Sequence, residues 1–407
     1  MKALFATHLK GDRTIWMVAL VLGITSLLAV YSACSWMAWR NDGGTLRVLA
    51  KHGMMLAAGG LIMYAVANSR YTLFSRLAQL ALPITIGLLA LTLVIGSNVN
   101  GASRWLAIPG LGITFQTSDL ARVTILVYLA RVLGRHREEP WTLKETALRI
   151  GLPVAAVCGL ILPANFSTAA LLALTCLLVM FIGQVPMKHI GALAGLGAIA
   201  FVLLLLLART WPDLLPRVAT WEKRIENWGA KDDGVLTPEE RDANYQTNNA
   251  KIAIVSGGFL PNGPGTGTSR NFMPHPESDM IYAFIIEEYG SIIGGMGLLL
   301  LYLILMSRAM KAADKAEKDF GKLAAIGLAL GLVLQALVNM AVAVNLVPVT
   351  GQPLPLVSMG GTSMWFTCLA IGIILSVSRG LNGDDAEKPQ ARPHTAPTST
   401  PDAAAAA

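Results

Sequence analysis

The sequence predicts an all-α integral membrane protein with ten transmembrane helices and a large outer loop between helices seven and eight. Hydrophobic residues make up 54% of the 407 residues and charged residues only 14%, whereas soluble domains carry roughly 25% charged residues. Ten apolar stretches approach the ~20 residues that a helix needs to cross a bilayer. Lysine and arginine are also distributed unevenly between the loops, as expected for a protein with a fixed orientation in a membrane.

The ten apolar stretches differ in how well they fit a membrane span. The fourth is interrupted by Asp119, Arg122 and Arg131. The eighth is too long for one straight crossing and carries Glu287 and Glu288, so we expect a bent or broken helix there. The stretches are 14–38, 48–68, 77–97, 116–134, 147–163, 166–184, 189–208, 279–307, 322–345 and 361–379.

Three parts of the chain differ in composition. Residues 1–13 form a polar, basic N-terminal segment, and no small-residue cleavage site follows the first apolar stretch, so we expect no removable signal peptide. Residues 14–379 form the membrane domain, with an outer loop at 209–278. Residues 380–407 are rich in Ala, Pro and Thr, a composition typical of a disordered tail.

The orientation follows from the basic residues of the short loops. If the N-terminus is cytoplasmic, nineteen Lys and Arg residues fall on the cytoplasmic side and five on the outer side. The loop 209–278 is left out of this count, because long loops are translocated across the membrane regardless of their charge. Both termini are therefore expected in the cytoplasm. The net charge of +7 is explained by topology, so we expect no nucleic-acid partner. The four cysteines lie in apolar stretches without a Cys-x-x-Cys pair, which argues against disulfides and a zinc site.

One acidic residue stands at the junction between the outer loop and the eighth stretch. Asp279 ends the polar run 274–279 and is followed by Met-Ile-Tyr-Ala-Phe. An ionisable group at this depth is costly unless it is paired or used, so Asp279 is a candidate functional residue. The alternative is an acid that stabilises the start of a helix without any chemistry.

A second candidate lies at the start of the fourth stretch. Asp119 and Arg122 are three residues apart, so they share one face of a helix and can pair. They follow the polar loop segment 100–105, which contains Arg104 and Trp105. The pair could serve a site or could be purely structural, since buried ion pairs often serve structure alone.

Two features of the outer loop could bind an anion. Arg217, Trp221 and Arg224 have the spacing of one face of an amphipathic helix, and arginine suits phosphate oxygens. An ordinary interfacial helix has the same pattern. The glycine-rich run 256–267 could cradle an anion with its backbone N–H groups. It lacks the Gly-Lys-Ser/Thr ending of a nucleotide-binding loop, and a flexible outer loop is the alternative.

The segment 349–363 contains two prolines and three glycines between apolar stretches. Non-helical backbone at membrane depth is tolerated only where protein buries it or where it lines a cavity. This composition favours a re-entrant loop packed near Asp279. A simple connecting turn is the alternative.

These segments together resemble the SEDS family (shape, elongation, division and sporulation), which includes FtsW, RodA and SpoVE. The resemblance rests on 100–105 with 116–122, on 274–290 and on 351–363, and it extends from the first to the tenth stretch. Met359 stands where the family usually has Tyr, and Ala164-Asn165 stands where it often has Pro-Asp, so any role of that acid does not carry over.

The resemblance implies a peptidoglycan glycosyltransferase that polymerises lipid II on the outer face of the plasma membrane during cell division. It implies a class B penicillin-binding protein and other divisome membrane proteins as partners, and a location at the division septum. A lipid II flippase and a non-catalytic scaffold are the alternatives. Asp279 is the candidate catalytic residue, either as general base or as a ligand of Mg²⁺ or Mn²⁺. The candidate substrate-binding residues are Arg104, Trp105, Asp119, Arg122, Arg217, Arg224, Glu288 and Ser358.

Overall fold

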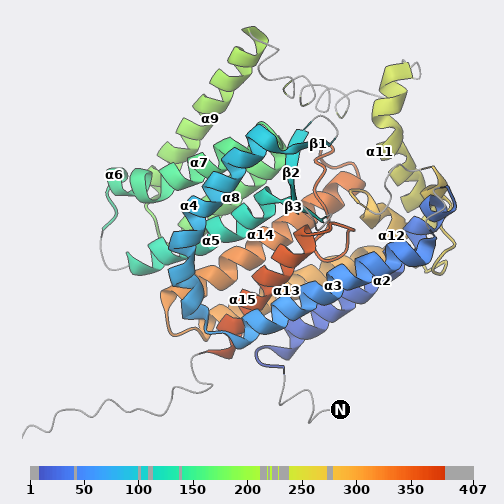
Figure 1. The fold of residues 1–407 in the computed structure, drawn as a ribbon, viewed down its shortest axis with the longest axis horizontal. Coiled ribbons are helices and arrows are strands. Elements are labelled where there is room, and N and C mark those ends of the chain that lie inside the picture. Colours follow the sequence, from blue (N-terminus) through green and yellow to red (C-terminus); the bar gives the residue numbers. More distant parts are fainter. Residues whose placement is uncertain are drawn as a thin grey trace, which may run out of the picture.

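The computed structural model describes residues 9–40, 44–99, 102–108, 113–136, 140–210, 238–272 and 278–380, and residues 218, 221 and 228 singly. These residues form a bundle of helices with a small sheet at one end, and both described chain ends lie at the opposite end (Figure 1). The helices are α2 (Arg13–Arg40), α3 (Thr45–Asn68), α4 (Tyr71–Ile95), α5 (Thr117–Arg135), α6 (Leu143–Thr146), η1 (Ala147–Gly151), α7 (Leu152–Ile161), α8 (Phe166–Ile182), α9 (Met187–Thr210), α11 (Pro238–Gly257), η3 (Ser269–Asn271), α12 (Ile281–Tyr289), η4 (Gly290–Met296), α13 (Gly297–Asp314), α14 (Asp319–Ala343) and α15 (Ser363–Arg379).

All ten predicted stretches are helical, which confirms the predicted helical membrane fold. Within the described part of the chain, six helical segments are long and apolar enough to cross a membrane, and α8 and α15 are shorter apolar helices. The fourth and fifth stretches correspond to α5 and to the run from α6 to α7. The number of ten membrane crossings stays a prediction.

The helices differ sharply in how deeply they are buried. In the most apolar 18-residue stretch of α14, 67% of the residues are buried, whereas only 6% are buried in the corresponding stretch of α9. Small residues on α14, such as Ala325, Gly327 and Gly331, allow α5, α8 and α13 to approach closely. The centre of the bundle therefore lies around α14 and α5, and α9 faces outward.

The predicted break in the eighth stretch is present. Helix α12 ends at Tyr289, Gly290 adopts a φ of 73°, and the π-helical turn η4 leads into α13. A side chain at Gly290 would collide with the carbonyl group of Leu260, with its Cβ only 2.6 Å from that carbon. The freed amides of Ser291 and Ile292 donate to the carbonyls of the neighbouring 258–259 segment at 2.9 and 3.3 Å. The break is therefore stabilised by the loop that packs against it.

A three-stranded antiparallel sheet was not predicted from the sequence. It consists of β1 (Ser97–Val99), β2 (Ala102–Ile108) and β3 (Ile113–Gln116), in that spatial order. The backbone of Trp105 pairs with Gln116, and β3 continues directly into α5. The Thr362 hydroxyl donates to the Thr114 carbonyl at 3.0 Å and so joins the sheet to the start of α15. The sheet thus fixes the end of α5 that carries Asp119.

Connecting segments lie at both ends of the bundle. At the end that holds both described termini, the amide of Asp12 donates to Ser378 at 2.9 Å and Arg379 donates to the carbonyl of Asn68 at 2.9 Å. At the other end lie the sheet and the segment 344–362 (Figure 1). Which end faces the cytoplasm stays a prediction.

Candidate functional site

Asp279 lies immediately before α12, with its backbone held from two sides. The side-chain amide of Asn339 on α14 donates to the carbonyl of Asp279 at 2.8 Å. The hydroxyl of Ser358 donates to the carbonyl of Ser278, also at 2.8 Å. These two contacts fix the chain at the point where the carboxylate leaves the backbone.

The carboxylate of Asp279 is partly exposed and makes few contacts. Its Oδ1 atom accepts a hydrogen bond from the hydroxyl of Ser278 at 2.9 Å, and it forms no ion pair with any residue that the structure describes. The N-cap of α12 is Met280, and no side chain caps this helix end. Asp279 therefore does not cap the helix, which leaves its carboxylate available for another partner.

The middle of the predicted re-entrant segment, residues 352–358, is buried beside Asp279, whereas Val344 and Leu346 before it are exposed. Gln352, Val357 and Ser358 are 2%, 0% and 4% exposed. A Cβ added to Gly351, which has a φ of 65°, would lie 3.5 Å from Oδ2 of Asp279. Four backbone carbonyls of this buried segment accept hydrogen bonds from side chains of the surrounding helices, at distances of 2.5 to 2.8 Å. The donors and acceptors are Asn339 to Gln352, Gln335 to Pro353, Tyr302 to Pro355 and Ser26 to Val357.

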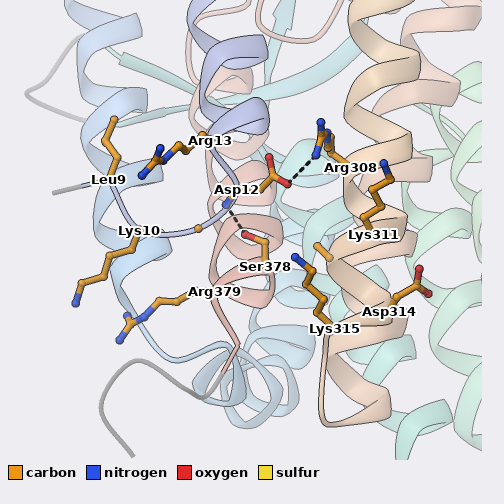
Figure 2. A pocket seen from close by; sticks show the side chains of 12 residues that line it. Leu9, Lys10, Asp12, Arg13, Arg308, Lys311, Asp314, Lys315, Ser378 and Arg379 are labelled. Atoms are coloured by element: carbon orange, nitrogen blue, oxygen red, sulfur yellow. Dashed lines mark hydrogen bonds and ion pairs between the residues drawn. The ribbon is translucent and has the colours of Figure 1, made fainter. Parts of the chain in front are cut away.

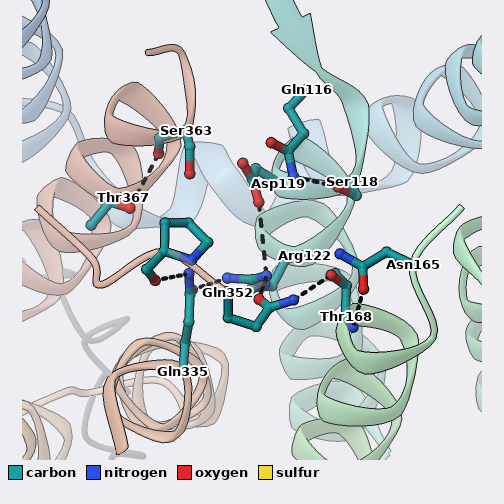
Figure 3. A network of polar contacts seen from close by, with 11 residues as sticks. Gln116, Ser118, Asp119, Arg122, Asn165, Thr168, Gln335, Gln352, Ser363 and Thr367 are labelled. Atoms are coloured by element: carbon teal, nitrogen blue, oxygen red, sulfur yellow. Dashed lines mark hydrogen bonds and ion pairs between the residues drawn. The ribbon is translucent and has the colours of Figure 1, made fainter. Parts of the chain in front are cut away.

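Arg122 occupies the centre of a buried polar network between α5, α8 and α14 (Figure 3). Its Nη2 atom lies 3.7 Å from Oδ1 of Asp119, and these side chains are only 12% and 5% exposed. Arg122 also donates to the amide oxygens of Gln335 and of Gln352. Gln352 in turn donates to the hydroxyl of Thr168 at 2.5 Å. The predicted pairing of Asp119 with Arg122 is confirmed, whereas contact of these two residues with a substrate stays a prediction.

The network extends from Arg122 to Asp279. The side chain of Gln352 accepts from Arg122, and its backbone carbonyl accepts from Asn339 at 2.7 Å. The same Asn339 amide holds the carbonyl of Asp279. Arg122 and Asp279 are therefore connected through two amide side chains, although they are separated by more than 150 positions in the sequence.

Glu287 and Glu288 fold the glycine-rich loop onto α12. Oε1 of Glu288, which is 0% exposed, accepts from the amide of Gly265 at 3.0 Å and from the hydroxyl of Ser32. Oε1 of Glu287 accepts from the amides of Thr268 and Ser269 at 2.9 and 3.1 Å. Gly265 belongs to the predicted run 256–267, whereas Thr268 and Ser269 follow it, so the predicted cradle holds the carboxylate of Glu288. Substrate contact by Glu288 stays a prediction.

The other predicted site residues fall into three groups. Arg217 and Arg224 lie outside the described residues, and so does the side chain of Arg104, whose backbone belongs to β2. Trp105 is partly buried in β2. Ser358 holds the chain before Asp279, as described above. In the ranges that the structure describes, no three His, Cys, Asp or Glu residues lie close enough to hold a metal ion.

Sequence reasoning missed the amides that connect the site. Gln335 and Asn339 are four residues apart, so they share one face of α14. Two amides at this spacing in an otherwise apolar helix are a signal of interhelical hydrogen bonding. Their partners could not be read from the sequence, since each lies far away along the chain.

These observations define a multi-pass helical membrane protein with a polar, carboxylate-bearing site at one end of its bundle. A family model described as "Cell cycle protein", for FtsW, RodA and SpoVE, matches residues 12–383. The chain therefore belongs to the FtsW/RodA/SpoVE family.

Several relatives resemble the chain over most of its length. It is 31% identical over 337 residues to a probable peptidoglycan glycosyltransferase FtsW of Nitrosococcus halophilus, which covers 81% of this chain and 82% of that relative. It is 27% identical to the stage V sporulation protein E of Bacillus subtilis, over 90% of this chain and 97% of that protein.

Solved structures share the fold. The rod shape determining protein RodA of Thermus thermophilus matches with a TM-score of 0.63 and 23% identity, over 91% of this chain and 97% of that one. A chain in a peptidoglycan synthase complex that coordinates polymerization and crosslinking matches with a TM-score of 0.65 and 24% identity, over 91% of this chain and 98% of that one.

Replacing Arg122 by Met is expected to destabilise the protein strongly, because Asp119 would remain buried without its ion-pair partner. Removing one member of a buried pair costs roughly 3–5 kcal/mol. The double variant Asp119→Leu/Arg122→Met should recover part of this loss. Thermal unfolding in detergent measures both changes.

The matched control is Lys322→Met, which breaks the partly exposed pair of Lys322 with Asp319, also three residues apart. Exposed pairs contribute only about 0–1 kcal/mol to stability. An Arg122→Met melting temperature as high as that of Lys322→Met would contradict a structural role for the buried pair.

Proposed function

We propose that this protein is a peptidoglycan glycosyltransferase that polymerises lipid II into glycan strands during cell division. Two lines support the proposal: the chain belongs to the FtsW/RodA/SpoVE family, and relatives such as that of Nitrosococcus halophilus are named as probable peptidoglycan glycosyltransferases. The single structural observation that carries it is Asp279, a partly exposed carboxylate without an ion-pair partner among the described residues, on a backbone fixed by Asn339 and Ser358.

Asp279 acts as the general base in this proposal. Glycan polymerisation forms a bond between an acceptor hydroxyl oxygen and the anomeric carbon of the donor sugar, and the bond from that carbon to the lipid diphosphate breaks. The hydroxyl is a poor nucleophile until its proton is removed, and a positioned carboxylate contributes typically about 10²–10⁴-fold to such a step. The proton passes to Asp279, and the lipid diphosphate leaves with the bonding electron pair.

A divalent cation is the alternative partner of Asp279. Mg²⁺ usually binds one or two carboxylates together with waters and substrate phosphates. A single partly exposed carboxylate beside a diphosphate fits that pattern, and Asp279 with the neighbouring Ser278 hydroxyl would supply the protein's share of the oxygen atoms. When bound, Mg²⁺ or Mn²⁺ would neutralise charge on the leaving diphosphate.

Asp279→Asn and Asp279→Ala are expected to abolish polymerisation while leaving the thermal stability of the protein unchanged. The carboxylate makes no ion pair with the described residues, so its loss should affect chemistry rather than folding. The measurement is glycan formation from labelled lipid II by purified protein with its transpeptidase. Glu317→Gln, an exposed acid in another loop, is the control. Long glycan strands made by either Asp279 variant would exclude both roles.

A titration with Mg²⁺ in the same assay distinguishes the two roles of Asp279. If the carboxylate binds the cation, excess Mg²⁺ should restore part of the polymerisation that Asp279→Asn loses, because a higher cation concentration offsets weaker binding. If the carboxylate is the base, added Mg²⁺ should leave the activity of Asp279→Asn unchanged. The same purified protein, treated with a chelator, shows whether the wild type needs a cation at all.

Arg104, Arg217 and Arg224 are proposed to contact the lipid-linked diphosphate, which gathers negative charge as it leaves. Replacing any one of them by Ala should weaken polymerisation roughly ten- to a hundred-fold, since a charge-assisted hydrogen bond contributes about 1.5–3 kcal/mol. Steady-state kinetics with lipid II measures the loss, and Arg149→Ala, which replaces a half-exposed arginine of η1, is the control. Unchanged kinetics for all three variants would leave these arginines without a role in binding.

The proposed orientation places both termini in the cytoplasm and the loop 209–278 outside, in the plasma membrane at the division septum. Single cysteines at Asp232 and Lys318 are expected to react differently with a membrane-impermeant thiol reagent in intact cells. The Asp232→Cys variant should be labelled and the Lys318→Cys variant protected, each in a background in which the native cysteines are replaced. The opposite labelling pattern would reverse the orientation and place the site on the cytoplasmic face.

A class B penicillin-binding protein is the proposed partner, together with other membrane proteins of the divisome. The support is the structural similarity to a chain of a complex that coordinates polymerization and crosslinking. Co-purification of the protein with its cognate transpeptidase tests this proposal, and failure of the two to associate in any detergent or lipid condition would contradict it.

A further inference from the structure

A cavity of about 690 Å³ opens at the end of the bundle that holds both described chain termini (Figure 2). It lies between three separate pieces of chain: residues 9–13, the last turns of α13 and the end of α15. The helices α12 and α13 and the turn η4 separate this cavity from Asp279. It is therefore distinct from the candidate site.

The cavity is built on specific contacts. Gly11 adopts a φ of 99°, and a Cβ there would lie 2.8 Å from the Leu375 carbonyl, so the segment packs tightly on α15. The Asp12 carboxylate accepts from the amide of Thr14 at 2.7 Å at the start of α2, and its other oxygen lies 3.7 Å from Arg308. Ser378 accepts from the amide of Asp12. These contacts make the cavity preformed.

Basic side chains dominate the cavity wall. Two acidic side chains, Asp12 and Asp314, line it, and Asp12 is already engaged by Arg308 and by the start of α2. The basic residues are six in number and come from all three pieces of chain: Lys10, Arg13, Arg308, Lys311, Lys315 and Arg379.

Two simpler explanations account for part of this charge. Cations near helix C-termini are favourable for the helix dipole, and the orientation of a membrane protein depends on the number of basic residues in short loops. Neither requires that basic residues from three separate segments line one preformed cavity. Their convergence indicates an anionic ligand.

We propose that this cavity binds the headgroup of an anionic phospholipid with two phosphates, such as cardiolipin. The cavity lies at the ends of apolar helices, where a lipid headgroup would be found, and basic pockets between transmembrane helices suit such headgroups. Its volume falls within the range of ligand pockets. Arginine and lysine supply the charge-assisted hydrogen bonds that phosphate oxygens accept.

The test is a titration of purified full-length protein with cardiolipin in neutral detergent, read by native mass spectrometry. The variant Lys10→Gln/Lys311→Gln/Lys315→Gln removes three exposed cations from the cavity, and binding should weaken roughly 10- to 100-fold. The control variant, Lys144→Gln/Lys188→Gln/Lys318→Gln, removes three exposed lysines that do not line the cavity and should bind like the wild type. Inorganic pyrophosphate and phosphatidylcholine are the comparison ligands and should bind far more weakly.

One further variant is expected to bind cardiolipin more tightly than the wild type, a result that misfolding would not produce. Asp314→Asn removes an exposed acid from the cavity wall and should tighten cardiolipin binding about five-fold. Equal losses in the two triple variants would show that only surface charge matters and would overturn the proposal. So would pyrophosphate binding as tightly as cardiolipin, which would make a soluble anion the ligand, or no saturable cardiolipin binding by the wild type.

Discussion

The structure depends on one constraint: the non-helical backbone of residues 352–358 lies buried among helices, so its polar groups need partners inside the protein. Unpaired carbonyl and amide groups in such a place would cost several kcal/mol each. The partners are side chains of the surrounding helices, among them Asn339 and Tyr302. Because Asn339 holds the carbonyls of both Gln352 and Asp279, the contacts that satisfy this segment also fix the position of the candidate catalytic residue.

The same constraint explains why acidic and amide residues are found inside the bundle. Glu287 and Glu288 pair with backbone amides of the glycine-rich loop, and that loop in turn covers the break at Gly290. Arg122 satisfies the amide oxygens of Gln335 and Gln352, and Asp119 offsets its charge. The structure therefore contains two polar networks: one holds the glycine-rich loop against α12, and the other holds the buried segment next to Asp279.

Local patterns in the sequence predicted the parts of the fold that depend on neighbouring residues. The length of the eighth stretch predicted its break, the three-residue spacing predicted the Asp119–Arg122 pair, and the composition of 349–363 predicted a buried segment near Asp279. Long-range pairings were missed, because nothing in one sequence links Gln352 to Thr168 or Glu288 to Ser32. The sheet was missed because its short strands, such as β2, adjoin apolar stretches and loop glycines that obscure their alternation. The arginines Arg217 and Arg224 lie outside the described residues and stay predictions.

The most direct test of this account is an experimental structure of the protein bound to lipid II, determined by cryo-electron microscopy in a lipid environment. The account predicts that an acceptor sugar hydroxyl lies about 2.6–3.2 Å from the Asp279 carboxylate. It also predicts that Asn339 and Ser358 still hold the backbone on either side of that carboxylate. A disaccharide bound with every hydroxyl beyond hydrogen-bonding reach of Asp279, or an Asp279 backbone released from Asn339, would contradict it.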